Sequence, residues 1–216
     1  MADVSDLLVI AATVRELAPA DGWRTLVCGV GPVEAAAATA AAIATRRPRA
    51  IVHVGIAGAR RASGLIPPAL VIGRVARYGD LAAAAAWAPV ELTPAASLVA
   101  AAREALPTAV CLPIGTSAAV GGTTGMDGID VEAMEGFAVL RAAAMTGVPA
   151  IEVRAISNAI EEPDRSRWAF EEAFAAITAA TPALVAAIAG VIERESAGAE
   201  ASGSASRTPG QTERLT

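Results

Sequence analysis

The sequence predicts an α/β fold, in which a central sheet is covered by helices on both faces. Two observations lead to this prediction. Short, almost wholly apolar segments recur along the chain, and helical segments or glycine-containing loops separate them. Strands that are apolar on both sides are typical of sheets buried between two helical layers. The length of 216 residues suits one domain with a substantial core.

The first half of the chain supplies four apolar segments that we interpret as strands: residues 7–13, 25–31, 50–59 and 69–80. A helix is predicted to follow the second strand at Pro32, because the fixed backbone of proline suits the first turn of a helix. This helix ends in Arg46 and Arg47, whose charges complement the negative end of the helix dipole.

The second half predicts a helix over residues 94–106, a strand pair or one bent strand over 109–120, a helix starting near Val131, and a strand over 149–160. A last helical region begins in "DRSRWAFEEAFAAI", with Asp164 or Ser166 as its N-cap. Residues 173–192 carry no charge over about the length of a membrane span, but they are rich in alanine and include Pro182. We therefore expect a buried helix that closes the domain.

From Glu195 onward the sequence has the composition of a linker, without apolar periodicity. The sequence thus predicts one α/β domain over residues 1–194 and a disordered tail over 195–216.

Composition and charge argue against several classes of function. The net charge is −5 and no basic run is present, which disfavours a nucleic-acid partner. All the basic residues are arginine, so no lysine can form a Schiff base, and the single His53 leaves no histidine cluster for zinc. Cys28 and Cys111 are expected to be buried, reduced thiols. The acidic N-terminus differs from the basic start of a signal peptide, so we expect a cytoplasmic protein.

Two glycine-containing loops follow predicted strands. In "CGVG" the third glycine of a dinucleotide fingerprint is missing, because Glu34 occupies its place. The second loop lies in "VGIAGA". Both loops are compatible with tight turns alone, but ligands in open α/β sheets bind beyond the carboxyl ends of the strands. Together they suggest one small-molecule pocket.

Four further residues stand near predicted strand ends, and each has a structural as well as a functional interpretation. Glu16 could be an ordinary helix acid, and Asn158 a turn residue. Met134 could belong to the core, and Glu135 could simply favour the start of a helix. The residue patterns alone therefore reach an α/β domain with a polar cleft at its strand ends.

The order of "VIAATVRE", "CGVGPVEAA", "VGIAGA", "RYGD", "VEAMEGFAV" and "VPAIEVRAISN" resembles the nucleoside phosphorylase and nucleosidase superfamily over residues 7–192. Within it, "GIAGA", "RYGDL", "VEAMEGF" and "RAISNAIEEPDRSRW" are most similar to the futalosine hydrolases. This resemblance implies a three-layer α/β/α domain with a mixed central sheet. It also implies no metal or organic cofactor, a small-molecule nucleoside as partner, neither nucleic acid nor membrane, and a homo-oligomer of at least two copies.

The implied reaction is hydrolysis of the N-glycosidic bond of futalosine to hypoxanthine and dehypoxanthine futalosine, a step of menaquinone biosynthesis. The resemblance assigns catalytic roles to Glu135 facing the ribose, Glu16 at the attacking water and Asn158 at the leaving purine. It assigns substrate contacts to Ile56, Ala57, Gly58 and Met134, with Phe137 as the nearest aromatic residue for the base.

Other activities stay open at this point. A methylthioadenosine/S-adenosylhomocysteine nucleosidase or a purine nucleoside phosphorylase would share the fold. Phosphorylases of the superfamily carry an arginine at the place of His53. We expect His53 to be packed and neutral and not to bind an anion. The short segment between Val120 and Val131 raises the alternative of an inactive nucleoside-binding homologue. For the carboxylate at the non-purine end of futalosine, the candidates are Arg60, Arg61 and Arg77.

Overall fold

The computed structural model describes residues 2–80 and 87–205, and within these residues it confirms an α/β fold with a mixed sheet. The strands are β1 Leu7–Ala11, β2 Arg24–Val27, β3 Ala50–Ala59, β4 Leu70–Tyr78, β5 Glu91–Leu92, β6 Val110–Thr116, β7 Val131–Ala133 and β8 Ala150–Ala159. The helices are α1 Pro32–Thr45, α2 Ala96–Ala105, α3 Gly136–Met145 and α4 Phe170–Ala205, with single 3-10 turns at η1 Val14–Glu16, η2 Arg61–Ser63 and η4 Arg165–Arg167.

The sheet is parallel on one side and closes on itself on the other. Strands β2, β1, β3 and β8 run parallel in that order. Strand β8 then pairs antiparallel with β4, β4 and β6 are parallel, β6 and β7 are parallel, and β7 returns antiparallel to β3. Apolar side chains of these five strands form a cluster of their own. The ring of strands therefore has its own small core beside the open part of the sheet.

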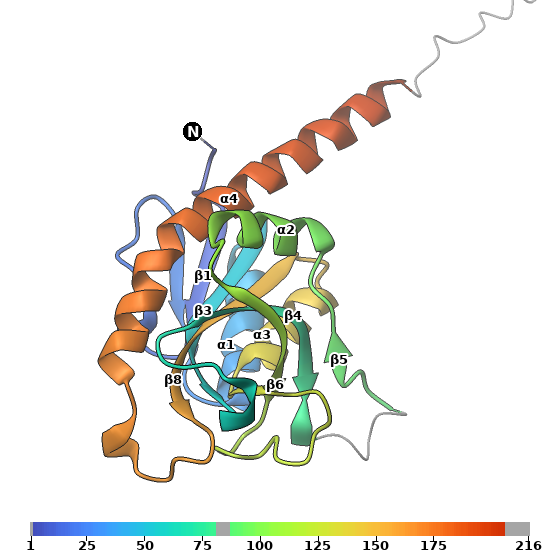
Figure 1. Ribbon diagram of the computed structural model, residues 1–216. Coiled ribbons are helices and arrows are strands. Elements are labelled where there is room, and N and C mark those ends of the chain that lie inside the picture. Colours follow the sequence, from blue (N-terminus) through green and yellow to red (C-terminus); the bar gives the residue numbers. More distant parts are fainter. Residues whose placement is uncertain (1, 81–86, 206–216) are drawn as a thin grey trace, which may run out of the picture.

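Helices cover both faces of the open sheet, as the apolar strands predicted (Figure 1). Along β1, Leu7 and Val9 pack with the residues of α2 and α4, whereas Leu8 and Ile10 pack with those of α1 and α3. This alternation follows from the two-residue period of a strand. Every residue of β1 is buried, which explains why the segment has no polar side chain.

Helix α4 is long and apolar enough to cross a membrane, judged by length and composition alone. In the fold, Ile177, Leu184 and Ile188 of this helix are fully buried against the sheet, in the core cluster shared with α2. The structure therefore places α4 as a core helix, with Pro182 inside it. In Figure 1 its C-terminal part projects beyond the rest of the domain.

Three boundary predictions were wrong. The helix expected near Val131 begins at Gly136, because residues 131–133 form β7 between β3 and β6. For residues 109–120 the alternative of one strand is confirmed, but this strand, β6, ends at Thr116 instead of Val120. Helix α4 continues past Glu195 to Ala205, so the predicted tail is helical over its first part, and residues 206–216 lie outside the described residues.

The two cysteines differ in burial. Cys28 is buried and Cys111 is partly exposed, and neither forms a disulfide. Burial raises the pKa of Cys28 to about 11, with Glu135 adding to the effect, so this thiol stays protonated at neutral pH. The prediction of a buried thiol therefore holds fully for Cys28 only.

The first residue of α3 must be glycine. A Cβ at Gly136 would lie 2.1 Å from both carboxylate oxygens of Glu152, whose side chain is fully buried and cannot withdraw. We expect Gly136→Ala to lower the free energy of unfolding by about 1–3 kcal/mol, the usual cost of overpacking. Urea unfolding of the purified protein measures this change.

Gly190 provides the matched control, because it is also helical and a Cβ there would meet only the end of the exposed Arg194 side chain, 3.3 Å away. Gly190→Ala should be neutral or stabilising by up to about 1 kcal/mol, since alanine loses less backbone entropy than glycine. Equal effects of the two substitutions would contradict the proposed close packing at Gly136.

Candidate active site

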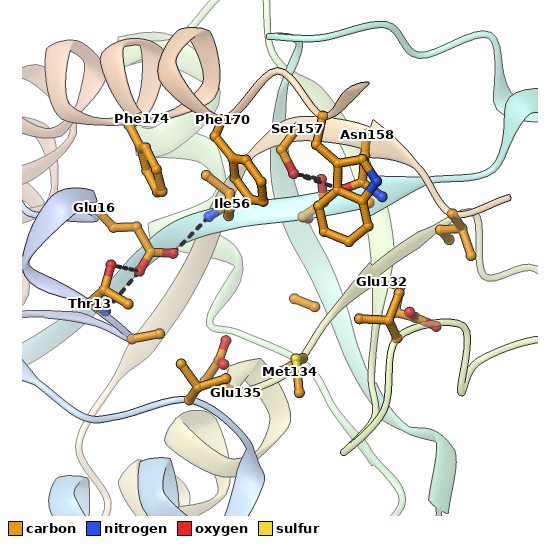
Figure 2. Close-up of a pocket in the computed structure, with 18 residues that line it drawn as sticks. Thr13, Glu16, Ile56, Glu132, Met134, Glu135, Ser157, Asn158, Phe170 and Phe174 are labelled. Carbon is orange, nitrogen blue, oxygen red and sulfur yellow. Dashed lines mark hydrogen bonds between the residues drawn. The ribbon is translucent and has the colours of Figure 1, made fainter. Parts of the chain in front are cut away.

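A pocket of about 240 Å³ lies where the carboxyl ends of β1, β3 and β8 meet the segment after β7 (Figure 2). This is the edge of the sheet at which open α/β folds bind ligands. Seven of the eight residues expected to form a site line this pocket: Glu16, Ile56, Ala57, Gly58, Met134, Glu135 and Asn158.

Glu16 is held in place by three hydrogen bonds. Its Oε2 atom accepts from the backbone N–H and from the hydroxyl of Thr13, both at 2.8 Å, and its Oε1 atom accepts from the backbone N–H of Ile56 at 3.1 Å. The side chain is buried at 3% exposure. A carboxylate can accept about four hydrogen bonds, so Glu16 is rigid and still able to accept one more.

Glu135 follows β7 and precedes the first residue of α3, and it is also buried. Its Oε1 atom accepts from the backbone N–H of Gly31 at 3.0 Å, and its Oε2 atom lies 3.5 Å from Nη2 of Arg154. Gly31 adopts a positive φ of 97°, a conformation that favours glycine. This turn before α1 aims a backbone donor at Glu135.

Arg154 of β8 lies close to both glutamates, and its side chain is fully buried. Its Nε atom donates to Glu152 at 2.8 Å, and Nη2 donates to Nε2 of His53. The Nδ1 atom of His53 lies 3.0 Å from the carbonyl oxygen of Ile10, which can only accept, so Nδ1 carries the proton. Burial and the charge of Arg154 lower the pKa of His53 well below its usual range, and the ring is neutral.

One donor group of Arg154 remains free. Its Nη1 atom is buried without a hydrogen-bond partner among the described residues. A Cβ at Gly55 would lie 2.2 Å from Nη1 and 2.8 Å from Oε1 of Glu16, so the glycine makes room for the guanidinium beside that carboxylate. Sequence reasoning missed Arg154. An arginine and a glutamate within the otherwise apolar "AIEVRAI" were the available signal.

The carboxyl end of β8 carries two neighbouring polar residues that both line the pocket, Ser157 and Asn158. Successive side chains of a regular strand point to opposite faces. Here the register with β3 shifts, so that Ile156 pairs with Ala57 and Asn158 with Gly58. Such a bulge re-aims a side chain, which brings Ser157 to the same cavity.

The amide of Asn158 is oriented by its neighbours. Its Oδ1 atom can accept from the hydroxyl of Ser157 at 2.8 Å, and its Nδ2 atom donates to the carbonyl of Ala159 at 2.9 Å. Because the carbonyl of Ala159 can only accept a hydrogen bond, the amide end that faces it must be the nitrogen. One amide hydrogen and one lone pair stay available to the pocket.

The prediction that Phe137 contacts the purine base was wrong, because Phe137 does not line the pocket. Its ring is buried in the core and stacks on Tyr78, with centroids 5.3 Å apart. The helix period of α3 turns this side chain away from Glu135 and toward the sheet. Three other aromatic residues line the pocket instead, namely Trp168, Phe170 and Phe174. Their close spacing in "WAFEEAF" was the missed signal.

The short segment after Val120 is firmly attached to the ring of strands. Glu132 accepts hydrogen bonds from the N–H and the hydroxyl of Thr123, at 2.8 and 2.6 Å. Arg60 donates to the carbonyls of Ile129 and Thr123, at 2.9 and 2.7 Å. Val120 and Glu132 both line the pocket, so this segment closes one side of it.

The described residues contain no cluster of three or more His, Cys, Asp or Glu side chains that could hold a metal ion. The polar side chains that line the pocket include three carboxylates and the amide of Asn158, and the guanidinium of Arg154 lies close to Glu16.

Comparison with known proteins agrees with this geometry. The family model of the phosphorylase superfamily matches residues 24–192. A futalosine hydrolase from Streptomyces coelicolor is 38% identical, over 73% of this chain and 76% of the relative.

Solved structures share the fold. A methylthioadenosine/S-adenosylhomocysteine nucleosidase from Colwellia psychrerythraea, in complex with adenine, has a TM-score of 0.71 and 23% identity and covers 86% of this chain and 95% of its own. A futalosine hydrolase from Helicobacter pylori has a TM-score of 0.63 and 17% identity, and the match covers 89% of this chain and 98% of the other. Family model, sequence relative and fold agree: the chain belongs to the phosphorylase superfamily and, within it, to the futalosine hydrolase family of nucleosidases.

Proposed function

We propose that this chain hydrolyses the N-glycosidic bond of futalosine, releasing hypoxanthine and dehypoxanthine futalosine for menaquinone biosynthesis. The observation that supports this best is the arrangement of Glu16, Glu135 and Asn158 around one pocket (Figure 2). A guanidinium nitrogen of Arg154, without a partner among the described residues, lies close to Glu16. Each of these groups matches one requirement of glycosidic cleavage.

The first requirement is stabilisation of positive charge on the ribose. Cleavage of the bond produces an oxocarbenium-like transition state. Glu135 is buried at the pocket wall and fixed by Gly31, so its negative charge is preorganised and poorly screened by water. Met134 supplies the adjacent apolar contact for the sugar.

The second requirement is an activated water molecule. Glu16 has one accepting position left after its three internal hydrogen bonds, and Nη1 of Arg154 lies beside it without a partner in the described structure. A water between these two groups would donate to the carboxylate and accept from the guanidinium. Glu16 then takes a proton as the water attacks the sugar.

The third requirement is a stable leaving purine. Asn158 has one amide hydrogen and one lone pair available, so it can donate to the 6-oxygen of hypoxanthine and accept from a protonated N7. The backbone of Ile56, Ala57 and Gly58 forms the wall beside it.

Hydrolysis fits the site better than phosphorolysis. His53, at the place where phosphorylases carry arginine, is fully buried and neutral and does not reach the pocket. The charged side chains that line the described pocket are Glu16, Glu132 and Glu135, which would repel a phosphate dianion.

The proposal includes a cytoplasmic location, no cofactor and a homodimer. The dimer rests on the resemblance to the family, and the exposed Val14, Val30 and Val33 beside the site offer an apolar surface for a second copy.

The function is tested by incubating the purified protein with futalosine, inosine and methylthioadenosine, each with and without phosphate. We expect free hypoxanthine from futalosine at the same rate in both buffers, because water is the nucleophile. Release of a sugar phosphate would identify a phosphorylase. Preferred cleavage of methylthioadenosine would identify the related nucleosidase, and binding without any cleavage an inactive homologue.

Glu135→Gln should lower kcat for futalosine on the order of 100-fold or more, because it removes the charge that faces the cationic sugar. Thermal unfolding checks that the variant is folded. The control is Glu34→Gln, an exposed glutamate in the first turn of α1, which should leave the rate unchanged. A rate near wild type in Glu135→Gln would remove this residue from the mechanism.

Asn158 should confer a preference for 6-oxopurines over 6-aminopurines. A 6-amino group would point a donor at the amide hydrogen, and an unpaired buried polar group costs roughly 1–3 kcal/mol, about one to two decades in kcat/KM. Asn158→Asp should shrink or reverse that preference, because an ionised carboxylate only accepts. The ratio of kcat/KM for futalosine and its 6-amino counterpart measures it in both proteins. A ratio of one in the wild type, or one untouched by the substitution, would contradict base reading by Asn158.

A further inference from the structure

The pocket and the proposed substrate have charges of the same sign. Futalosine carries a carboxylate at its non-purine end, whereas the charged residues lining the described pocket are three glutamates, Glu16, Glu132 and Glu135. Without a cation near the far end of the pocket, burial of this substrate would bring like charges together. A basic residue at that end would offset the repulsion and select the substrate.

The arginines suggested by sequence alone have other contacts. Arg60 donates to backbone carbonyls of the segment before β7. Arg61 pairs with Glu162, and Arg77 pairs with Glu91. No arginine lines the described pocket directly, and these three do not lie on any of its aromatic rings.

Two other arginines lie on aromatic rings of the pocket wall. The guanidinium of Arg15 lies 4.4 Å from the centre of the Phe174 ring, and that of Arg165 lies 5.6 Å from the Trp168 ring. The two rings stand at different ends of the pocket. The residue after Trp168 donates its backbone N–H to the carbonyl of Ser157 at 2.8 Å, so Arg165 belongs to the end that binds the base.

Arg15 belongs to the opposite end. It directly precedes Glu16 in η1, and Figure 2 shows Phe174 above Glu16, away from Ser157 and Asn158. With the base at Asn158 and the sugar between Glu16 and Glu135, the non-purine end of the substrate extends toward Phe174. An aromatic ring and a guanidinium together suit an aromatic carboxylate.

We propose that Arg15 binds the carboxylate of the substrate's non-purine end and so selects anionic nucleosides. This inference rests on the proposed function. In the structure Arg15 pairs with Glu171, but the side chains are 55% and 79% exposed. Exposed pairs of this kind are weak and easily exchanged. The planar guanidinium also has five donors, enough to bind the substrate while keeping Glu171.

The test compares futalosine with its methyl ester, which has one additional methyl group and no negative charge. We expect kcat/KM of the wild type to be roughly tenfold higher for the acid than for the ester, because a partly exposed charge pair contributes modestly to binding. The difference should lie mainly in KM. Arg15→Gln should bring the acid-to-ester ratio close to one, and Arg15→Lys should restore most of it. Using the ratio separates the charge of Arg15 from any effect on the neighbouring Glu16, which would slow both compounds alike.

Arg165→Gln is the matched control, because it removes the other guanidinium that lies on a pocket aromatic. It should leave the acid-to-ester ratio unchanged. A wild type without preference for the acid, an unchanged ratio in Arg15→Gln, or a ratio lost equally in Arg165→Gln would overturn the assignment while the proposed function stands. A wild type that cleaves neither compound would overturn the proposed function and this inference with it.

Discussion

The buried guanidinium of Arg154 is the charge around which the site is built. Burial alone would lower its pKa, but Glu152, Glu135 and Glu16 outweigh that effect and raise it, so the side chain is cationic. A charge inside a sheet is tolerated only when it is paired and hydrogen-bonded. Glu152 and the neutral His53 provide that pairing on the side of the core. The remaining donor lies near Oε1 of Glu16 and has no partner among the described residues.

Three buried glutamates, of which Glu16 and Glu135 interact with this charge, also hold the chain segments around the pocket. Glu16 ties η1 to the backbone of β3, and Glu135 ties the start of α3 to the turn before α1. Glu132 does the same for the segment after Val120. The carboxylates that the proposed chemistry needs are therefore fixed by backbone donors, and their positions do not depend on the substrate. Preorganisation of this kind is what makes an electrostatic contact effective in a transition state.

Prediction from sequence succeeded where local pattern and burial coincide. The strands β1, β3 and β8 were found because both of their faces are covered, which leaves a nearly continuous apolar pattern. It failed at β7, which has three residues and exists only because β3 and β6 flank it. It also failed for Phe137, because a position two residues after Glu135 does not reveal that the ring packs in the core against Tyr78.

The sequence by itself determined the fold class, because buried strands leave a continuous apolar pattern. Its short motifs determined the family through their resemblance to a known superfamily, and that resemblance pointed to seven of the residues that line the pocket. Only the tertiary structure decided what surrounds them. The aromatic wall comes from the start of α4 and the residue Trp168 that precedes it. The pairing of Arg154 joins β8 with β3 and the segment after β7, and the bulge at Ser157 arises from pairing with β3. These contacts join residues far apart in the chain, and their geometry is set by packing rather than by any local preference.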